Sequence, residues 1–191
     1  MYQKYFKRLF DVIISLNLII FFLPLMFLIF FMIWIFIGFP IFKQKRPGLK
    51  NKIFTLYKFK TLVDPAKNIS EEKRQTKFGN FLRKTGLDEL PQLFNILGNN
   101  MSLVGPRPLL LEYLKKYSDY EKQRHLVKPG LTGLAQVSPT QSKKKSWNQS
   151  IKLDVKYAKN VSFILDLKIL LKTIPVVLMN KKQYNDFKKS L

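Results

Sequence analysis

The chain has 191 residues, a length that fits one domain with a single hydrophobic core. Its 34 Lys and Arg outnumber its 12 Asp and Glu, and the formal net charge of +22 predicts an anionic partner: nucleic acid, a phospholipid surface or a phosphorylated small molecule. The absence of Cys excludes disulfides, thiolate nucleophiles and Cys-ligated zinc, and a single His argues against a His-based metal cluster. Any metal would therefore be bound through oxygen, as Mg²⁺ is.

Residues 12–42 form the most apolar stretch of the chain and contain no charged side chain. As a straight helix this stretch would be about 46 Å long, whereas the hydrocarbon core of a membrane is only about 30 Å thick. It is too long for the apolar core of a signal peptide and lacks a small-residue cleavage site. We therefore expect a membrane segment that stays in the mature protein.

The flanks and the centre of this segment bear on how it enters the membrane. A helix that spans once usually has its Lys and Arg on the cytoplasmic side. Here both flanks are basic, with Lys4, Lys7 and Arg8 on one side and Lys43, Lys45 and Arg46 on the other. Pro24, near the middle, removes a backbone donor and favours a kink or a helix that turns back. The residues favour a re-entrant segment, with a tilted single span as the alternative.

Next in the chain, residues 41–61 predict a β-hairpin, because Pro47 and Gly48 separate two short runs of alternating side chains. Residues 64–77 are polar and aperiodic, which predicts a loop able to cover a site.

Three later stretches show helical spacing of apolar residues. Residues 88–97 predict a short helix, and residues 109–124 predict an exposed amphipathic helix followed by a surface histidine, His125. Residues 163–179 are apolar but include three charges, which predicts an interfacial or core helix rather than a span. The fold expected is mixed α/β, mostly helical with a small β-hairpin.

Two adjacent acids, Asp88 and Glu89, stand out in the stretch RKTGLDELPQLFN. Thr85 and Asp88 have the spacing of a helix start, and Pro91 is tolerated only in a first turn, so we expect both acids at a helix N-terminus. The helix dipole there favours ionised carboxylates. Capping of the helix is the simplest function for Asp88 on this local evidence.

The cations around the acids indicate a second function. Arg83 and Lys84 precede them, and Arg107 follows between Pro106 and Pro108, which restrict its backbone. A rigidly held guanidinium suits a phosphate oxygen, because it forms two parallel hydrogen bonds. Acids together with phosphate-binding cations are the groups that phosphoryl transfer requires, although the chain has no P-loop or kinase motif.

Six ordered segments resemble the bacterial sugar transferases, and more closely the small monotopic phosphoglycosyl transferases. They are FKQKRPG (42–48), YKFKT (57–61), LDELPQLFN (87–95), MSLVGPRPLL (101–110), KPGLTGLAQV (128–137) and NVSFILDLKIL (160–170). The resemblance runs from the N-terminus to about residue 180, and an ordered set of six motifs is highly specific.

The resemblance implies an enzyme that moves a phospho-sugar from a UDP-sugar to polyprenyl (undecaprenyl) phosphate and releases UMP. Asp88 would be the nucleophile of a covalent aspartyl-phosphosugar intermediate, and Glu89 its acid/base or metal-positioning partner. Both acids would bind Mg²⁺. Phosphates of donor or acceptor would be bound by the basic residues of the matched segments, namely Lys60, Arg83, Arg107 and Arg46.

The same resemblance implies a monotopic membrane protein of the bacterial inner membrane. Residues 1–42 would form a re-entrant helix-break-helix with its break at Pro24, and residues 43–191 a cytoplasmic catalytic domain with interfacial amphipathic helices. Its partners would be the UDP-sugar, the polyprenyl phosphate, membrane lipid and downstream glycosyltransferases, with no nucleic acid. The product would begin a protein glycan, capsule or lipopolysaccharide.

Three positions depart from the family pattern: Leu23 where relatives have Ser, Asn99-Asn100 where relatives have Gly-Asp, and residues 138–146 after the AQV segment. These departures bear on the geometry of the break and on donor specificity. A different class of function is also open, a non-catalytic basic membrane protein that binds anionic lipid or nucleic acid and in which Asp88 is replaceable.

Overall fold

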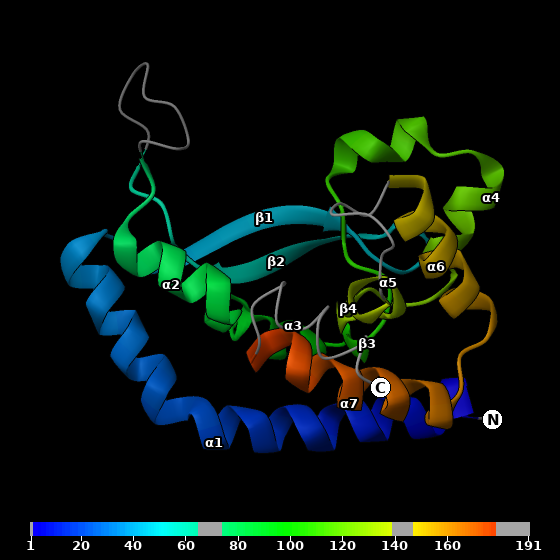
Figure 1. The fold of residues 1–191 in the computed structure, drawn as a ribbon, viewed down its shortest axis with the longest axis horizontal. Coiled ribbons are helices and arrows are strands. Elements are labelled where there is room, and N and C mark those ends of the chain that lie inside the picture. Colours follow the sequence, from blue (N-terminus) through cyan, green and yellow to red (C-terminus); the bar gives the residue numbers. More distant parts are fainter. Residues whose placement is uncertain (1, 65–73, 139–146, 179–191) are drawn as a thin grey trace, which may run out of the picture.

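The computed structural model describes residues 2–64, 74–138 and 147–178, which form mostly helices with two small sheets (Figure 1). The helices and strands in the N-terminal half are η1 (Tyr2–Phe6), α1 (Lys7–Phe36), β1 (Ile41–Pro47), η2 (Leu49–Asn51), β2 (Ile53–Phe59), α2 (Lys77–Thr85), η4 (Leu87–Glu89) and α3 (Gln92–Leu97). Those that follow are β3 (Ser102–Val104), η5 (Leu111–Lys116), α4 (Asp119–Lys122), η6 (Gln123–Leu126), β4 (Gly130–Thr132), α5 (Leu134–Val137), α6 (Trp147–Lys159) and α7 (Phe163–Leu178). The predicted fold class, mixed and mostly helical, is confirmed.

The predicted β-hairpin is confirmed. Strands β1 and β2 pair antiparallel, with Ile41 opposite Phe59 and Pro47 opposite Ile53. The turn between them contains Lys50 and Asn51, both with positive φ. The hairpin extends above α1 in Figure 1, and its residues line a cavity of about 1020 Å³.

Helix α1 is one continuous helix that contains Pro24, and its axis bends near its middle (Figure 1). Proline explains such a bend, because it lacks the amide hydrogen that would bond to the preceding turn and its ring crowds that turn. One stripe of α1 faces the protein at a spacing of three to four residues, which places those side chains on one helix face. The stripe consists of Lys7, Asp11, Ser15, Ile19, Met26, Ile29 and Ile33.

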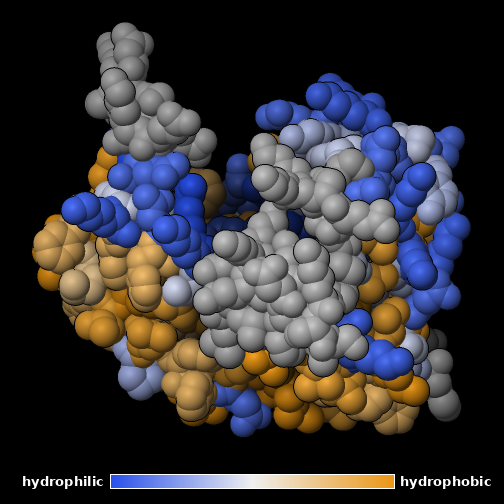
Figure 2. All heavy atoms as spheres, viewed as in Figure 1, coloured by the Kyte–Doolittle hydropathy of each residue, from blue (hydrophilic) through white to orange (hydrophobic). Residues whose placement is uncertain are grey.

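The opposite face of α1 and the outer face of α7 are apolar and exposed, and we call them together the apolar belt. Its members are Ile13, Leu16, Ile20, Phe21, Leu23, Phe27, Leu28, Phe31, Trp34, Ile35, Phe163, Ile164, Leu167, Leu171, Ile174 and Val177. Hydrophobic side chains gather along the lower edge of the molecule in Figure 2. Among the described residues, α1 is the one helix long and apolar enough to cross a membrane. An exposed apolar surface of this extent is typical of membrane contact.

The central core joins the hairpin, α3 and the start of α7. Leu56, Leu93, Ile96 and Ile169 are buried together there. Helix α7 confirms the helix predicted from residue 163 onward, with one face buried in this core and the other in the apolar belt.

A two-stranded parallel sheet, β3 with β4, anchors the segment that carries Arg107. The backbones of this sheet approach so closely that a Cβ atom on Gly130 would lie 2.0 Å from the amide nitrogen of Gly105. Both positions therefore require glycine, which explains one glycine in each of the motifs GPRP and PGLTG.

Several local predictions were wrong. Thr85 does not begin a helix: it is the last residue of α2, and its hydroxyl donates to the carbonyls of Phe81 and Leu82. The helix expected over 88–97 is a 3-10 turn followed by the six-residue α3. The helix expected over 109–124 is broken into η5, α4 and η6, because Ser118 caps a new helix through a capping box with Glu121.

His125 is buried, with 6% of its surface exposed, and is not the surface residue predicted. Burial and the neighbouring charge of Arg124 lower the pKa of His125 to about 4, so its imidazole is neutral at physiological pH. Residues 65–73 of the expected loop and residues 139–146 after the AQV segment lie outside the described residues.

Candidate active site

A cavity of about 1020 Å³ opens between the hairpin, α2, η4, the segment after β3 and the C-terminal end of α7. All six residues predicted to act on substrate line this one cavity: Asp88, Glu89, Lys60, Arg83, Arg107 and Arg46. Since these residues come from four separate stretches of sequence, their convergence is a property of the tertiary fold. Pro24 lies elsewhere, inside α1.

The two acids reach the cavity through a change of chain direction at Gly86. This residue ends α2 with φ of 72°, a conformation that glycine adopts without strain. The 3-10 turn η4 follows and carries Asp88 and Glu89, and Pro91 then precedes the first residue of α3. The acids therefore lie in the first turn of the short 3-10 helix η4, between α2 and α3. Neither η4 nor α3 has a side-chain cap hydrogen bond, so capping does not explain Asp88.

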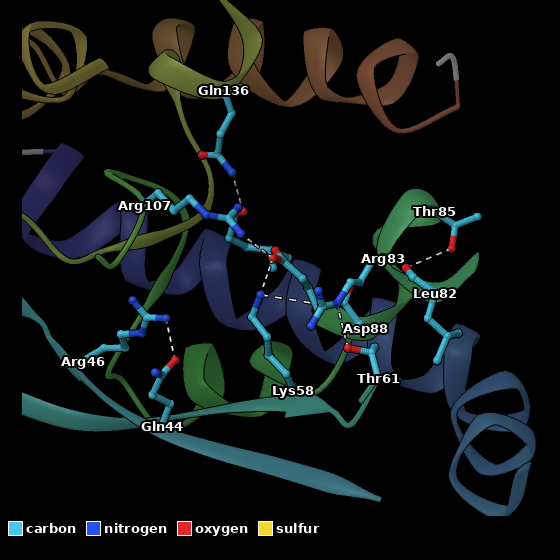
Figure 3. Close-up of polar contacts among 12 residues, drawn as sticks. Gln44, Arg46, Lys58, Thr61, Leu82, Arg83, Thr85, Asp88, Arg107 and Gln136 are labelled. Carbon is cyan, nitrogen blue, oxygen red and sulfur yellow. Dashed lines mark hydrogen bonds and ion pairs between the residues drawn. The ribbon is translucent and has the colours of Figure 1, made fainter. Parts of the chain in front are cut away.

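Glu89 is held by two cations. Lys58 Nζ lies 2.6 Å and Arg107 Nη2 2.8 Å from the same oxygen, Glu89 Oε1. Burial opposes ionisation of this carboxyl, but the charges and hydrogen bonds of Arg107 and Lys58 outweigh burial and hold the pKa of Glu89 below its ordinary value. Glu89 is thus an ionised, fixed anion that orients both cations. Figure 3 shows the side chains of Lys58 and Arg107 turned toward each other.

Asp88 has a different environment. Its nearest cation is Lys58, whose Nζ lies 3.9 Å from Asp88 Oδ2, and within the described chain no side chain or amide donates a hydrogen bond to its carboxylate. Burial raises the pKa of Asp88 above its ordinary value and the charge of Glu89 adds to this effect, while Lys58, Arg83 and Arg107 oppose it. Opposite pKa shifts in neighbouring acids are typical of sites that assign them separate tasks.

Lys58 is a site residue that the sequence did not predict. It is the only cation that forms ion pairs with both acids in the described part of the chain, and its side chain is only 20% exposed. The alternation of side chains along β2 could have predicted that Lys58 faces the cavity. Residues two apart in a strand share a face, and Lys58 is two positions before the predicted residue Lys60. Lys60 itself binds Asp64, at 2.6 Å, and not the acid pair.

The remaining cations line the cavity without pairing to either acid. Arg83 Nε donates to the hydroxyl of Thr61 at 2.8 Å, and Arg46 Nη2 donates to Gln44 Oε1 at 2.5 Å (Figure 3). Burial lowers the pKa of Arg46, and the nearby charge of Arg107 adds to this effect. A bound phosphate would relieve the repulsion between these two cations.

Arg107 is positioned by a buried arginine that was not predicted. Arg124 is 1% exposed, and its Nη2 donates to the backbone carbonyl of Arg107 at 2.6 Å and to Asp154 Oδ2 at 2.6 Å. Its Nη1 also donates to the hydroxyl of Tyr117 at 3.1 Å. The Pro106–Pro108 segment is therefore fixed both by its prolines and by this internal ion pair.

The described residues include no group of three or more His, Cys, Asp or Glu side chains able to bind a metal. Asp88 and Glu89 still fit Mg²⁺, which commonly binds one or two carboxylates and completes its shell with water and substrate phosphates. The oxygens of Asp88 that no donor occupies are suitable ligands.

Two departures from the family pattern lie outside the cavity. Leu23 is exposed in the apolar belt, and Asn100 is exposed in the loop after α3. Neither residue lines the wall around the acids.

The site combines paired acids with a cationic cavity, and it lies beside an apolar helix long enough to cross a membrane. This arrangement is expected of a site that acts on phosphates near a lipid surface. The chain belongs to the bacterial sugar transferase family, whose model matches residues 2–180. The family predicted from the six segments is thus confirmed.

Individual relatives agree with this assignment. EpsL of Bacillus subtilis, named as an uncharacterized sugar transferase, is 49% identical over 150 residues, which are 76% of this chain and 73% of that protein. The undecaprenyl-phosphate galactose phosphotransferase of Salmonella typhimurium is 36% identical over 203 residues, covering 95% of this chain and 42% of that protein. The UDP-glucose:undecaprenyl-phosphate glucose-1-phosphate transferase of Klebsiella pneumoniae is 37% identical over 192 residues, covering 94% and 41%. The chain thus spans about two fifths of the length of the latter two relatives.

Proposed function

We propose that the protein transfers a sugar 1-phosphate from a UDP-sugar to polyprenyl phosphate, with release of UMP, as the first membrane step of glycoconjugate synthesis. The observation that carries the proposal is the contrast between the two acids: Glu89 is fixed by two cations, whereas Asp88 points into the same cavity with its oxygens available. The names of the Salmonella and Klebsiella relatives describe this class of reaction.

In the first step, the cavity binds the diphosphate of the UDP-sugar. Arg83, Arg107, Arg46 and Lys60 contact its oxygens and offset the repulsion between substrate and carboxylate. An oxygen of ionised Asp88 attacks the sugar-linked phosphorus, and the bridging P–O bond breaks. UMP departs with the electron pair, and the sugar phosphate stays bound to Asp88 as an acyl phosphate.

In the second step, an oxygen of polyprenyl phosphate attacks the same phosphorus and the bond to Asp88 breaks, which restores the carboxylate. Glu89 holds Lys58 and Arg107 in place through both steps. Mg²⁺ held by Asp88 and Glu89 would neutralise charge on the phosphate oxygens.

The acceptor is amphipathic, and the cavity lining includes apolar side chains that suit it, among them Phe42, Leu110, Val176 and Val177. Val177 also belongs to the apolar belt and is 48% exposed, so the belt continues into the cavity at the C-terminal end of α7. The prenyl chain would enter there, with its phosphate toward Asp88.

The membrane segment fits a re-entrant arrangement with its break at Pro24. Near its start, Lys7 pairs with Asp166 at 2.6 Å, and near its end Ile33 packs with Phe59 and Leu82. Both halves of α1 thus contact the same polar body, whereas the far end of a spanning helix would lie across the membrane from it. The basic flanks favour the cytoplasmic side for this body.

The proposal is tested by incubating the purified full-length protein with Mg²⁺, a panel of UDP-sugars and undecaprenyl phosphate, and measuring UMP. Asp88→Asn keeps the size of the side chain but lacks the nucleophilic oxygen charge, so we expect no UMP above background. Asp119→Asn, a substitution of an exposed acid, is the matched control. Full activity in Asp88→Asn would overturn the assignment of Asp88 as the nucleophile. No UMP from any donor would favour a non-catalytic protein that binds anionic lipid or nucleic acid.

A further inference from the structure

A second cavity, of about 490 Å³, lies at the end of α3 away from the acid pair, and we call it the α1-start cavity. It is bounded by the first turns of α1, the hairpin turn and the segment before β4. Among the described residues, none lines both this cavity and the one around Asp88. Four cations line it, with a single carboxylate, Asp11: they are Lys7, Arg8, Lys50 and Lys128.

The bonds already made by Arg8 leave its charge uncompensated. Its Nη1 donates to the carbonyl of Ile96 at 2.6 Å and its Nη2 to that of Leu97 at 2.8 Å, and both acceptors are neutral. Lys7 differs, because it is buried and paired with Asp166 at 2.6 Å. Arg8 is therefore held rigidly at the wall of the cavity by the C-terminal end of α3 and still has its full charge available to an anion.

The other two cations are also without an acidic partner. Lys128 donates to the side-chain oxygen of Asn99, a neutral amide, and no ion pair to a described carboxylate is formed by Lys128 or Lys50. Partial burial and the neighbouring charges of Arg8 and Lys7 lower the pKa of Lys128, against the effect of Asp11. A bound anion would raise the pKa of Lys128 again, because it would offset the repulsion among the cations.

The surroundings of the cavity indicate the source of the anion. Leu49 and Leu126 line its rim and are 36% and 56% exposed. Phe6 and Leu9, beside Lys7 and Arg8 in the chain, are exposed apolar residues at the start of the helix that contributes most of the apolar belt. A phosphate that reaches this position with an apolar chain attached would find cations inside the cavity and apolar side chains around it.

We propose that the α1-start cavity binds the phosphate of an anionic phospholipid headgroup, with Arg8, Lys50 and Lys128 as its ligands. Binding would fix the first turns of α1 and the hairpin turn at the membrane surface. The inference does not depend on the transfer reaction, because the cavity is separate from the acid pair.

The test uses the purified full-length protein in a neutral detergent, titrated in parallel with dihexanoyl phosphatidylglycerol, dihexanoyl phosphatidylcholine and inorganic phosphate. The test variant is Lys50→Asn/Lys128→Gln, in which Asn suits the positive φ of position 50. The control variant, Lys152→Gln/Lys156→Gln, removes the same charge from an exposed face of α6. Circular dichroism checks that both variants are folded.

We expect saturable binding of phosphatidylglycerol, much weaker binding of the zwitterionic phosphatidylcholine, and a loss of affinity of roughly tenfold or more in the test variant only. An equal loss in the control variant would mean diffuse attraction and overturn the proposal. So would inorganic phosphate binding as tightly as phosphatidylglycerol, because the ligand would then be a free anion. Binding that is lost in Arg83→Gln but retained in the test variant would place the lipid in the cavity of the acid pair and also overturn it.

Discussion

Lys58 offers the sharpest test of the site, because it contacts both acids and was not evident from the sequence. In Lys58→Met, Glu89 keeps Arg107 as a partner, whereas Asp88 loses its nearest cation. Two unit charges about 4 Å apart interact by roughly 4 kcal/mol at an effective dielectric constant of 20, which is an upper bound for this partly exposed pair. Loss of a group that stabilises developing charge at an active site commonly lowers kcat by about 100-fold or more, and we expect a loss of that order.

The pH dependence identifies the cause of that loss. Asp88 must be ionised to attack, so activity falls as the pH decreases through its pKa, which burial already raises. Lys58 opposes this rise, so its removal raises the pKa further and moves the acidic limb of the pH–rate profile to higher pH. Lys58→Arg keeps the charge, and we expect its acidic limb to stay near that of the unmodified protein. The assay is UMP release across a pH series, and an acidic limb at the same pH in Lys58→Met and the unmodified protein would refute the reasoning.

Three further predictions concern the support of the site and the proposed Mg²⁺. Arg124→Met removes the cation that pairs with buried Asp154 and should cost about 3–5 kcal/mol of unfolding free energy, measured with urea. Arg124→Met/Asp154→Leu should recover most of that stability but not UMP release, because the carbonyl of Arg107 still lacks its donor; recovery of both would contradict a positioning function. Gly130→Ala places a Cβ against the backbone of Gly105 and should destabilise the fold by about 1–3 kcal/mol, measured as a lower melting temperature. An unchanged melting temperature would show that the two backbones separate easily. Chelation with EDTA should abolish UMP release and added Mg²⁺ should restore it; full activity in EDTA would remove the metal from the proposal.

Local patterns predicted the elements whose stability is local. Pro47 and Gly48 between alternating runs gave the hairpin, and the apolar spacing from residue 163 gave α7. The prediction that 109–124 forms one helix failed, because the capping box at Ser118 begins a new helix there. Thr85 failed for a related reason: its spacing to Asp88 matched a cap, but its hydroxyl bonds backward within α2.

Buried polar residues were the hardest to predict. Arg124 and His125 lie in a basic stretch that looks exposed, and only packing against α6 buries Arg124 with Asp154, a residue 30 positions away. Lys58 could have been found from strand alternation, but its contact with Glu89 depends on how η4 packs against β2.

The sequence by itself determined the family, the apolar segment and the identity of the acid pair, because these depend on residue types in a fixed order. The tertiary structure decided which acid is fixed and which is open, since Lys58 and Arg107 reach Glu89 from separate stretches of the chain and the environment of Asp88 is set by burial. It also decided that both halves of α1 lie against one polar body and that a second basic cavity forms where α1 begins. Charge, burial and distance are properties of the assembled fold, and no local pattern specifies them.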